Sequence, residues 1–448
     1  MGKVELIMKS TIGLTGNTAW SVAGYSLYLV GQWGILIILA QCGGPEMIGE
    51  YALALAICAP LIMFSNLRLR HVLSTDSGDR YGFRHYLSLR IITTLMSLLS
   101  IFLIGYITQS RKEAVFVICI VGIAKAFEAV SDIFHGLQQK HEKMKYVTIS
   151  LVTKAGISLL AFWATIHFTH RLLLGCLSLT AAWGMVLFAY DIPMAKRTDN
   201  VVHGKKPDSN IGSQPILKKA EGISFSDLQR LAWLSLPLGV VGLLSSLGTN
   251  VPRYFVEIYL GKAQLGIFAG MDYIIYAGHY LVNSAGNAVI PRMARYFGEG
   301  KYSSYRHLLF WSFALVFSFG FLIIFVSILF GRTLLGVFYG PIYAEYVKLL
   351  ILLSIAGALE YINLIIWHGI TASWHFRVQP VAFGIHVVSI SLFCFFLIPQ
   401  YSLVGVGYSL ICSNLIQFVI GGSILTFILG RTSRQVGELI RNTDYKKQ

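Results

Sequence analysis

Four ionisable side chains recur at helical spacing inside an apolar stretch of membrane length, residues 115–139. They are Lys125, Glu128, Asp132 and His135. At about 100° per residue these positions fall within an arc of about 80°, so a helix would carry all four on one face. An ionised side chain at the centre of a bilayer costs at least about 2.5–3.5 kcal/mol, so these groups need one another, a charged partner helix or a water-filled cavity. Two interpretations follow: a structural cluster of ion pairs within a helix bundle, or the charged wall of a translocation pathway.

Polar residues in other apolar stretches could complete such a cluster or pathway. Lys154 lies in the following stretch and is the expected cross-helix partner of Glu128 or Asp132. Near the N-terminus, and again from Asp272 onward, polar residues recur at helical spacing, which predicts a face that is either hydrogen-bonded or wet. The candidate pathway residues are Lys125, Glu128, Asp132, Lys154, Asp272, His279, Asn283, Glu360, Asn17 and Gln32.

A basic segment follows the second apolar stretch and contains Arg68, Arg70 and Arg84. A guanidinium group can hold a phosphate through two parallel hydrogen bonds, so this segment predicts an entrance site for a lipid phosphate at the cytoplasmic surface. The alternative is that these arginines only anchor the chain at the membrane surface.

Composition defines the elements that must position these residues. Of the 448 residues, 55% are hydrophobic and only 13% are charged, against about 25% in an ordinary soluble domain. Apolar runs of about 20 residues, enough to cross a bilayer as a helix, recur along the chain. We therefore predict an all-α polytopic membrane protein with about twelve transmembrane helices. The predicted spans are 16–40, 46–65, 87–107, 114–137, 147–167, 171–191, 229–249, 264–290, 307–330, 343–370, 378–398 and 403–429.

The distribution of positive charge predicts the topology. Arg90, Arg171 and Arg230 fall within the first four residues of a span and are counted with the segment before it. On that count 27 of the 36 Lys and Arg residues lie in segments on the side of both termini, 6 lie on the opposite side and 3 lie inside spans. Because cytoplasmic segments carry the excess of basic residues, both termini are expected in the cytoplasm. The net charge of +15 therefore reports topology and does not indicate nucleic-acid binding.

A polar segment divides the chain into two halves. Residues 192–228 have the Pro-, Gly- and Lys-rich composition of a cytoplasmic linker. They separate an N-terminal six-helix lobe, 1–191, from a C-terminal six-helix lobe, 229–430, which precedes a cytoplasmic tail, 431–448. Short sequence matches connect the two halves. For example, Tyr51-Ala52 in the second span of the first lobe matches Phe268-Ala269 in the second span of the other lobe. Such matches indicate a parallel tandem repeat.

The sequence lacks the common signatures of enzymes and of metal sites. It contains no GxSxG, HExxH or P-loop motif, and the six cysteines show no metal-binding spacing. We therefore expect no catalytic residues, no bound metal and no cofactor, although transport could be coupled to a proton or sodium gradient. Two polar-walled halves whose helices contain Gly and Pro favour a transporter.

Two motifs resemble those of a known family. Asn66-Leu67-Arg68-Leu69-Arg70, and Lys125 with Glu128, Ser131-Asp132, Gly136 and Gln138, are similar to Wzx-type flippases of the multidrug/oligosaccharidyl-lipid/polysaccharide exporter superfamily. The resemblance implies flipping of an undecaprenyl-diphosphate-linked glycan across the bacterial cytoplasmic (inner) membrane for O-antigen, lipopolysaccharide or exopolysaccharide export. It also implies contacts with membrane lipids, a glycan polymerase and a chain-length regulator. The family's cavity is often cationic, whereas the acids Glu128, Asp132, Asp272 and Glu360 depart from that pattern.

Three other interpretations remain open. A drug antiporter of the same fold could use Asp272 or Glu360 to carry a proton or sodium ion. A lipid II flippase is a second alternative, although such proteins typically have two further spans. A structural membrane protein is the third. Glycosyltransferase genes beside this one would favour the polysaccharide flippase.

Overall fold

The computed structural model describes residues 2–76, 80–109, 111–203 and 224–445, and none of these residues lies in a β-strand. The elements are α1 (Gly2–Cys42), α2 (Gly44–Ser65), α3 (Leu69–Thr75), α4 (Phe83–Thr108), α5 (Lys112–Lys140), α6 (Met144–Thr169), α7 (Leu172–Val186), the π-helical turn η1 (Leu187–Asp191), α8 (Ile192–His203), α9 (Phe225–Gly298), α10 (Tyr302–Tyr339), α11 (Pro341–Ala344), α12 (Val347–Ala372), the 3₁₀ turn η2 (Phe376–Val378) and α13 (Gln379–Tyr445). The all-α polytopic prediction is confirmed.

Within the described residues, ten helical stretches are long and apolar enough to cross a membrane. Two of them are interrupted by a residue with non-helical backbone angles, α9 at Gly261 and α13 at Ser402. Gly261 has φ +84°, a conformation that glycine adopts without steric penalty. Dividing the two helices at these residues gives twelve membrane-length segments in the described part of the chain.

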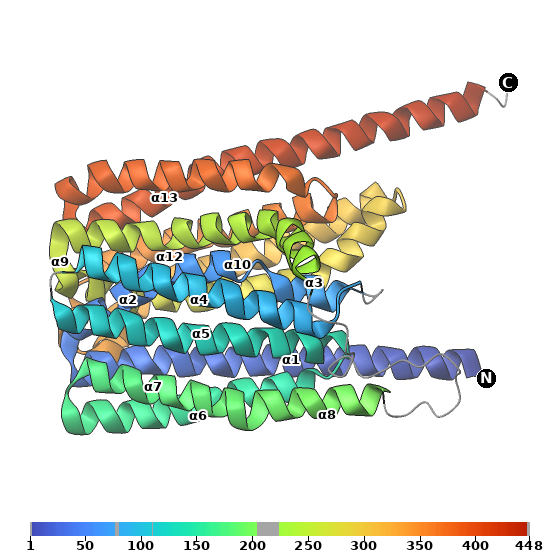
Figure 1. Cartoon of the computed structure of the whole chain (residues 1–448). Helices are drawn as coiled ribbons and strands as arrows, with labels where there is room; N and C mark the ends of the chain where they lie inside the picture. The colour runs from blue at the N-terminus through green and yellow to red at the C-terminus, as the bar shows by residue number, and fades with distance from the viewer. Residues whose placement is uncertain (1, 77–79, 110, 204–223, 446–448) are drawn as a thin grey trace. The chain divides into compact units, whose positions relative to one another are not determined.

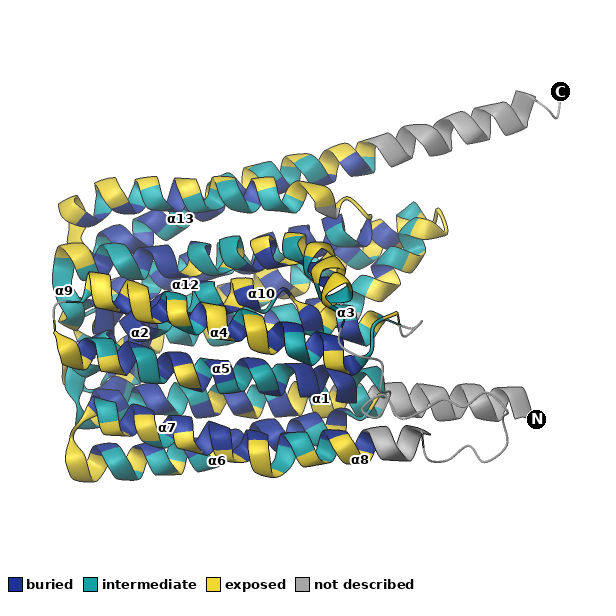
Figure 2. Ribbon diagram, in the orientation of Figure 1, coloured by how far each residue is buried: buried dark blue, intermediate teal, exposed yellow. Residues whose placement is uncertain are grey.

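The chain divides into two compact units, Met1–Asn250 and Val251–Gln448. In the first unit α5 is the central helix, because it contacts α2, α3, α4, α6, α7, η1 and α8 (Figure 1). Half of the most apolar window of α5 is buried, against 28% for α4, which keeps an exposed apolar face (Figure 2). The helix with the charged face is therefore in contact with most of the other helices of its unit.

Small residues let α1 pack closely on α6. A Cβ atom added to Gly24 would lie 2.8 Å from Thr148 Oγ1, and one added to Gly31 would lie 2.8 Å from Ala155 Cβ. Close approach of backbones at small residues is the usual basis of helix packing in membranes. The glycines of the first span therefore serve the contact with α6.

A sharp break separates α2 from α3. Leu67 and Arg68 both have left-handed backbone angles, with φ of 46° and 47°. The break turns α3 back onto α5, where Leu69 and Leu73 join a buried cluster with Phe134 and other apolar residues. This packing fixes the position of Arg70 on the inner side of α3.

In the second unit, α12 packs against α10 and α13. Tyrosine hydroxyls tie helices to main-chain carbonyls, with Tyr339 donating to Gly270 O at 2.7 Å and Tyr361 donating to Ile275 O at 2.6 Å. Buried hydroxyls must find such partners in a bilayer, because no water is present to replace them.

The predicted linker and tail are only partly described. Helix α8 continues the sixth span through twelve residues that the composition assigns to the linker. The rest of that segment up to residue 223, including Lys205 and Lys206, lies outside the described residues. The first of the two compact units also takes in the first part of α9, and α13 extends through most of the predicted tail to Tyr445.

Candidate functional site

Two arginines converge on Asp132 inside the first unit. Asp132 Oδ1 lies 3.0 Å from an Arg70 guanidinium nitrogen, and Oδ2 lies 3.4 Å from an Arg90 nitrogen. The Arg90 side chain is fully buried, and that of Arg70 is 14% exposed. A carboxylate that receives two guanidinium groups leaves one positive charge in excess at this point.

The two guanidinium groups have further partners that fix their orientation. Arg70 donates to the Tyr25 hydroxyl and, through Nε, to Gln139 Oε1 at 3.0 Å. Arg90 donates to Asn66 Oδ1. The partners come from α1, from α5 and from the residue that follows α2, so the cluster joins these elements to α3 and α4.

A second cluster surrounds Asp191, the last residue of the π-helical turn η1. Asp191 accepts a hydrogen bond from Ser131 at 2.5 Å and lies 3.4 Å from His135 Nε2. Lys154 Nζ lies 3.8 Å from Asp191 and donates to Ser131 at 3.0 Å. The Lys154 and Asp191 side chains are only 2% and 1% exposed. A π-turn inserts an additional residue into a helix and often marks a functional position.

The part of the charged face of α5 nearer its N-terminus is more open. Lys125 Nζ lies 2.8 Å from Glu128, which also accepts a hydrogen bond from the Tyr28 hydroxyl at 2.7 Å. Lys125 also lies over the Trp183 ring, 5.1 Å from its centroid. The Lys125 and Glu128 side chains are 23% and 33% exposed, so this pair borders an accessible space.

Two ion pairs of the second unit involve predicted pathway residues. Arg253 lies 2.9 Å from Asp272, and His279 Nδ1 lies 2.9 Å from Glu360. Tyr276 stacks on the His279 ring at 5.9 Å between centroids. The Glu360 side chain is 41% exposed. Asp272 and Glu360 are each paired with a basic group, and the pathway role of this polar face stays a prediction.

Several sequence-based placements need correction. Lys154 pairs with Asp191, and not with Glu128 or Asp132 as expected. Arg70 points into the first unit, whereas Arg68 and Arg84 are exposed, so the three arginines do not share one environment. The left-handed break before α3 separates Arg68 from Arg70, whereas Arg84 lies on a different helix, α4.

The remaining predicted residues have modest roles in the described structure. Asn17 accepts a hydrogen bond from the Met144 main-chain nitrogen at 3.4 Å, which supports the contact between α1 and α6. Gln32 and Asn283 are half-buried.

Sequence reasoning missed Arg90, Asp191 and Arg253 as members of these clusters. The charge distribution assigns Arg90 to a loop on the side of the termini and Arg253 to a loop on the opposite side, and the predicted sixth span ends at Asp191. A signal for Arg90 was present, since it is followed directly by a long apolar run.

The charge balance of the first unit's interior is close to neutral. Among the described residues, four basic side chains, Arg70, Arg90, Lys125 and Lys154, face three acidic ones, Glu128, Asp132 and Asp191. Among all the described residues, no group of three or more His, Cys, Asp or Glu side chains is arranged so that it could hold a metal ion. The arrangement can bind an anion by exchange of ion-pair partners.

Comparison with known proteins identifies the family. Residues 14–297 match the family described as "Polysaccharide biosynthesis protein". The capsular polysaccharide biosynthesis protein CapF of Staphylococcus aureus is 26% identical over 385 residues, which cover 86% of this chain and 92% of that protein.

Solved structures share the fold. The lipid II flippase MurJ in an inward closed conformation gives a TM-score of 0.70 at 12% identity, covering 93% of this chain and 90% of that one. An outward-facing multidrug resistance MATE family transporter gives 0.65 at 12% identity, covering 94% and 96%. The fold is thus that of multi-pass helical membrane transporters, and the family match covers more than half of the sequence. The chain belongs to the polysaccharide biosynthesis protein family.

Proposed function

We propose that this protein flips a polyprenyl-diphosphate-linked oligosaccharide across the bacterial cytoplasmic membrane for surface polysaccharide export. Alternating access would move the glycan without any covalent step, so the protein acts as a transporter and needs no cofactor. Membership of a polysaccharide biosynthesis family supports the pathway. The fold shared with a lipid II flippase supports the type of cargo.

The observation that carries the proposal is the pairing of Arg70 and Arg90 with one carboxylate, Asp132. A diphosphate offers several oxygens to the same two guanidinium groups, and charge-assisted bidentate contacts are the strong ones. Asp132 would hold the arginines in place until the substrate diphosphate takes over their hydrogen bonds. The partners come from α3, α4 and α5, so this exchange would alter how three helices pack.

The Arg70→Lys variant tests this role. Lysine keeps the charge but loses the planar fork, so we expect export to fall by about tenfold or more while membrane abundance stays near that of the natural protein. The measurements are surface polysaccharide, lipid-linked oligosaccharide that accumulates in the cell, and protein abundance by immunoblot.

Arg84→Lys is the matched control, because Arg84 is an exposed arginine of the same basic segment. It should leave export unchanged. Full export by Arg70→Lys at normal abundance would show that Arg70 only anchors α3, and the phosphate role would then be wrong.

A drug or cation antiporter is the second candidate function. The half-exposed Glu360 beside His279 favours it, because an accessible acid in a membrane helix can exchange a cation. A deletion strain tested against a panel of cationic drugs separates the two: hypersensitivity with normal polysaccharide would favour the antiporter.

A further inference from the structure

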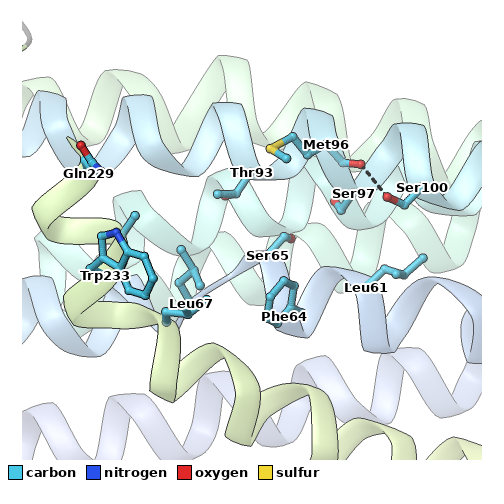
Figure 3. Close-up of a pocket in the computed structure, with 12 residues that line it drawn as sticks. Leu61, Phe64, Ser65, Leu67, Thr93, Met96, Ser97, Ser100, Gln229 and Trp233 are labelled. Atoms are coloured by element: carbon cyan, nitrogen blue, oxygen red, sulfur yellow. Dashed lines mark hydrogen bonds between the residues drawn. The ribbon is translucent and has the colours of Figure 1, made fainter. Parts of the chain in front are cut away.

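An apolar groove lies on the first unit, formed by the end of α2, the middle of α4 and the start of α9. Its volume is about 340 Å³. Figure 3 shows Trp233 and Gln229 of α9 at one end of the groove, and Leu61 of α2 with Ser100 of α4 at the other.

The groove offers hydrocarbon contacts and almost no free hydrogen-bonding groups. Four hydroxyl groups line it, but each one donates to a main-chain carbonyl of its own helix, at 2.8–3.0 Å. They belong to Ser65, Thr93, Ser97 and Ser100. Only Gln229 and Trp233, at one end of the groove, bring further N–H donors, so most of its length offers a sugar or a headgroup nothing to bind, whereas a hydrocarbon chain needs no donors.

The small residues of α4 shape one wall. Thr93, Ser97 and Ser100 are spaced i, i+4 and i+7, so they share one helix face over about 10 Å. Met96 lines the same wall with a longer side chain, so the three short side chains leave a recess beside it. A recess between larger side chains suits a chain with methyl branches.

The groove has a polar end and a deep end. Leu67 lines the groove, and the exposed Arg68 follows it directly in the chain. Gln229 lies one turn before Trp233 on α9, at the membrane-interface end of that helix. The opposite end, at Leu61 and Ser100, lies further along each of two membrane-length helices. The chain thus carries a cation directly after a residue that lines this hydrocarbon-rich groove, which complements an anionic head joined to an apolar tail.

We propose that this groove binds the polyisoprenoid tail of the lipid-linked substrate, at the isoprene units nearest the diphosphate. The inference rests on the proposed function and adds a second binding site to it. Bilayer hydrocarbon is as apolar as the groove, so the gain comes from packing and not from the hydrophobic effect. The site selects a branched polyisoprenoid over straight acyl chains, and it holds the diphosphate close to the basic segment.

The first experiment fills the groove. Ser100→Trp places an indole in its deep end, whereas Leu99→Trp places the same group on the exposed face of the same helix. In nanodiscs, we expect Ser100→Trp to weaken binding of undecaprenyl diphosphate by about tenfold and Leu99→Trp to leave it unchanged. Inorganic diphosphate, which has no tail, should bind all three proteins equally.

The second experiment leaves the groove unfilled and so does not depend on the folding of Ser100→Trp. A photoreactive phenylalanine analogue replaces Trp233, which lines the groove. In the control protein the same analogue replaces Leu234, which does not line the groove. Both positions are more than half exposed, so either can reach a bound lipid. Undecaprenyl diphosphate should crosslink at position 233 and not at 234, and excess phosphatidylglycerol should not displace it.

The outcomes separate this inference from the proposed function. If the natural protein does not bind undecaprenyl diphosphate, the proposed function fails and the tail site fails with it. If it binds, but both tryptophan variants bind equally well, or phosphatidylglycerol competes at position 233, the proposed function stands and the groove is an ordinary lipid contact.

Discussion

At the scale of single residues, the charged side chains of the first unit fall into two groups by exposure. The Lys154 and Asp191 side chains are at most 2% exposed, whereas those of Lys125 and Glu128 are 23% and 33% exposed. Removing one partner of a buried pair typically costs about 3–5 kcal/mol, whereas an exposed pair contributes about 0–1 kcal/mol. A structural role therefore suits the first group, and a role in the pathway suits the second.

The Lys125→Ala variant distinguishes these roles. Glu128 would keep its hydrogen bond from Tyr28, and its exposure limits the loss of stability, so we expect near-normal membrane abundance. If Lys125 meets a phosphate or a sugar acid of the substrate, glycan export should be abolished. Abundance and export are measured side by side in the same strain.

The Lys125→Ala/Glu128→Ala double variant is the control for a purely structural pair. A structural pair predicts that the single variant loses abundance and that the double variant regains it. That pattern would remove Lys125 from the transport pathway.

At the scale of elements, the charged face of α5 could be predicted because helical spacing alone defines it. The partners could not, since they depend on which helices surround α5 and on local backbone geometry. The left-handed break at Leu67 and Arg68 aims Arg70 inward, and the π-turn η1 ends on Asp191, next to Lys154. Neither feature has a reliable signature in a single sequence.

The contact between α1 and α6 offers an element-scale prediction. Gly31→Leu would force a side chain into Ala155, and overpacking of this kind typically costs about 1–3 kcal/mol. We expect a lower thermal-unfolding midpoint of the purified protein and a lower membrane abundance.

Gly156→Leu is the matched control on α6, because a Cβ atom there meets nothing within 4 Å. Equal stability of the two variants would show that α1 and α6 are not held by close glycine packing.

At the scale of the whole molecule, the excess of basic residues on one side of the membrane predicts the orientation. Glu299 lies between α9 and α10 on the side with 27 Lys and Arg residues, and Glu345 lies between α10 and α12 on the side with 6. Both residues are exposed. In a cysteine-free background and intact cells, an impermeant maleimide should label Glu345→Cys and spare Glu299→Cys. The reverse pattern would invert the topology.

The number of spans was predictable at this scale because length and hydropathy determine it. The positions at which spans end were less predictable. Helices α9 and α13 each run through two predicted spans, with one non-helical residue between the two. Hydropathy reports burial in lipid and not backbone angles, so it cannot show that α8 continues the sixth span. The division into two six-helix lobes stays a prediction.

The buried pair of Lys154 and Asp191 also constrains how the chain enters the membrane during synthesis. The lysine is made 37 residues before its partner. At about 5–20 residues per second, the ribosome needs roughly two to seven seconds to supply the aspartate. During that interval α6 carries a lone cation, which disfavours its release into lipid on its own. The hairpin from Met144 to Asp191 is therefore the shortest segment that can leave the translocon with this lysine neutralised by its own carboxylate.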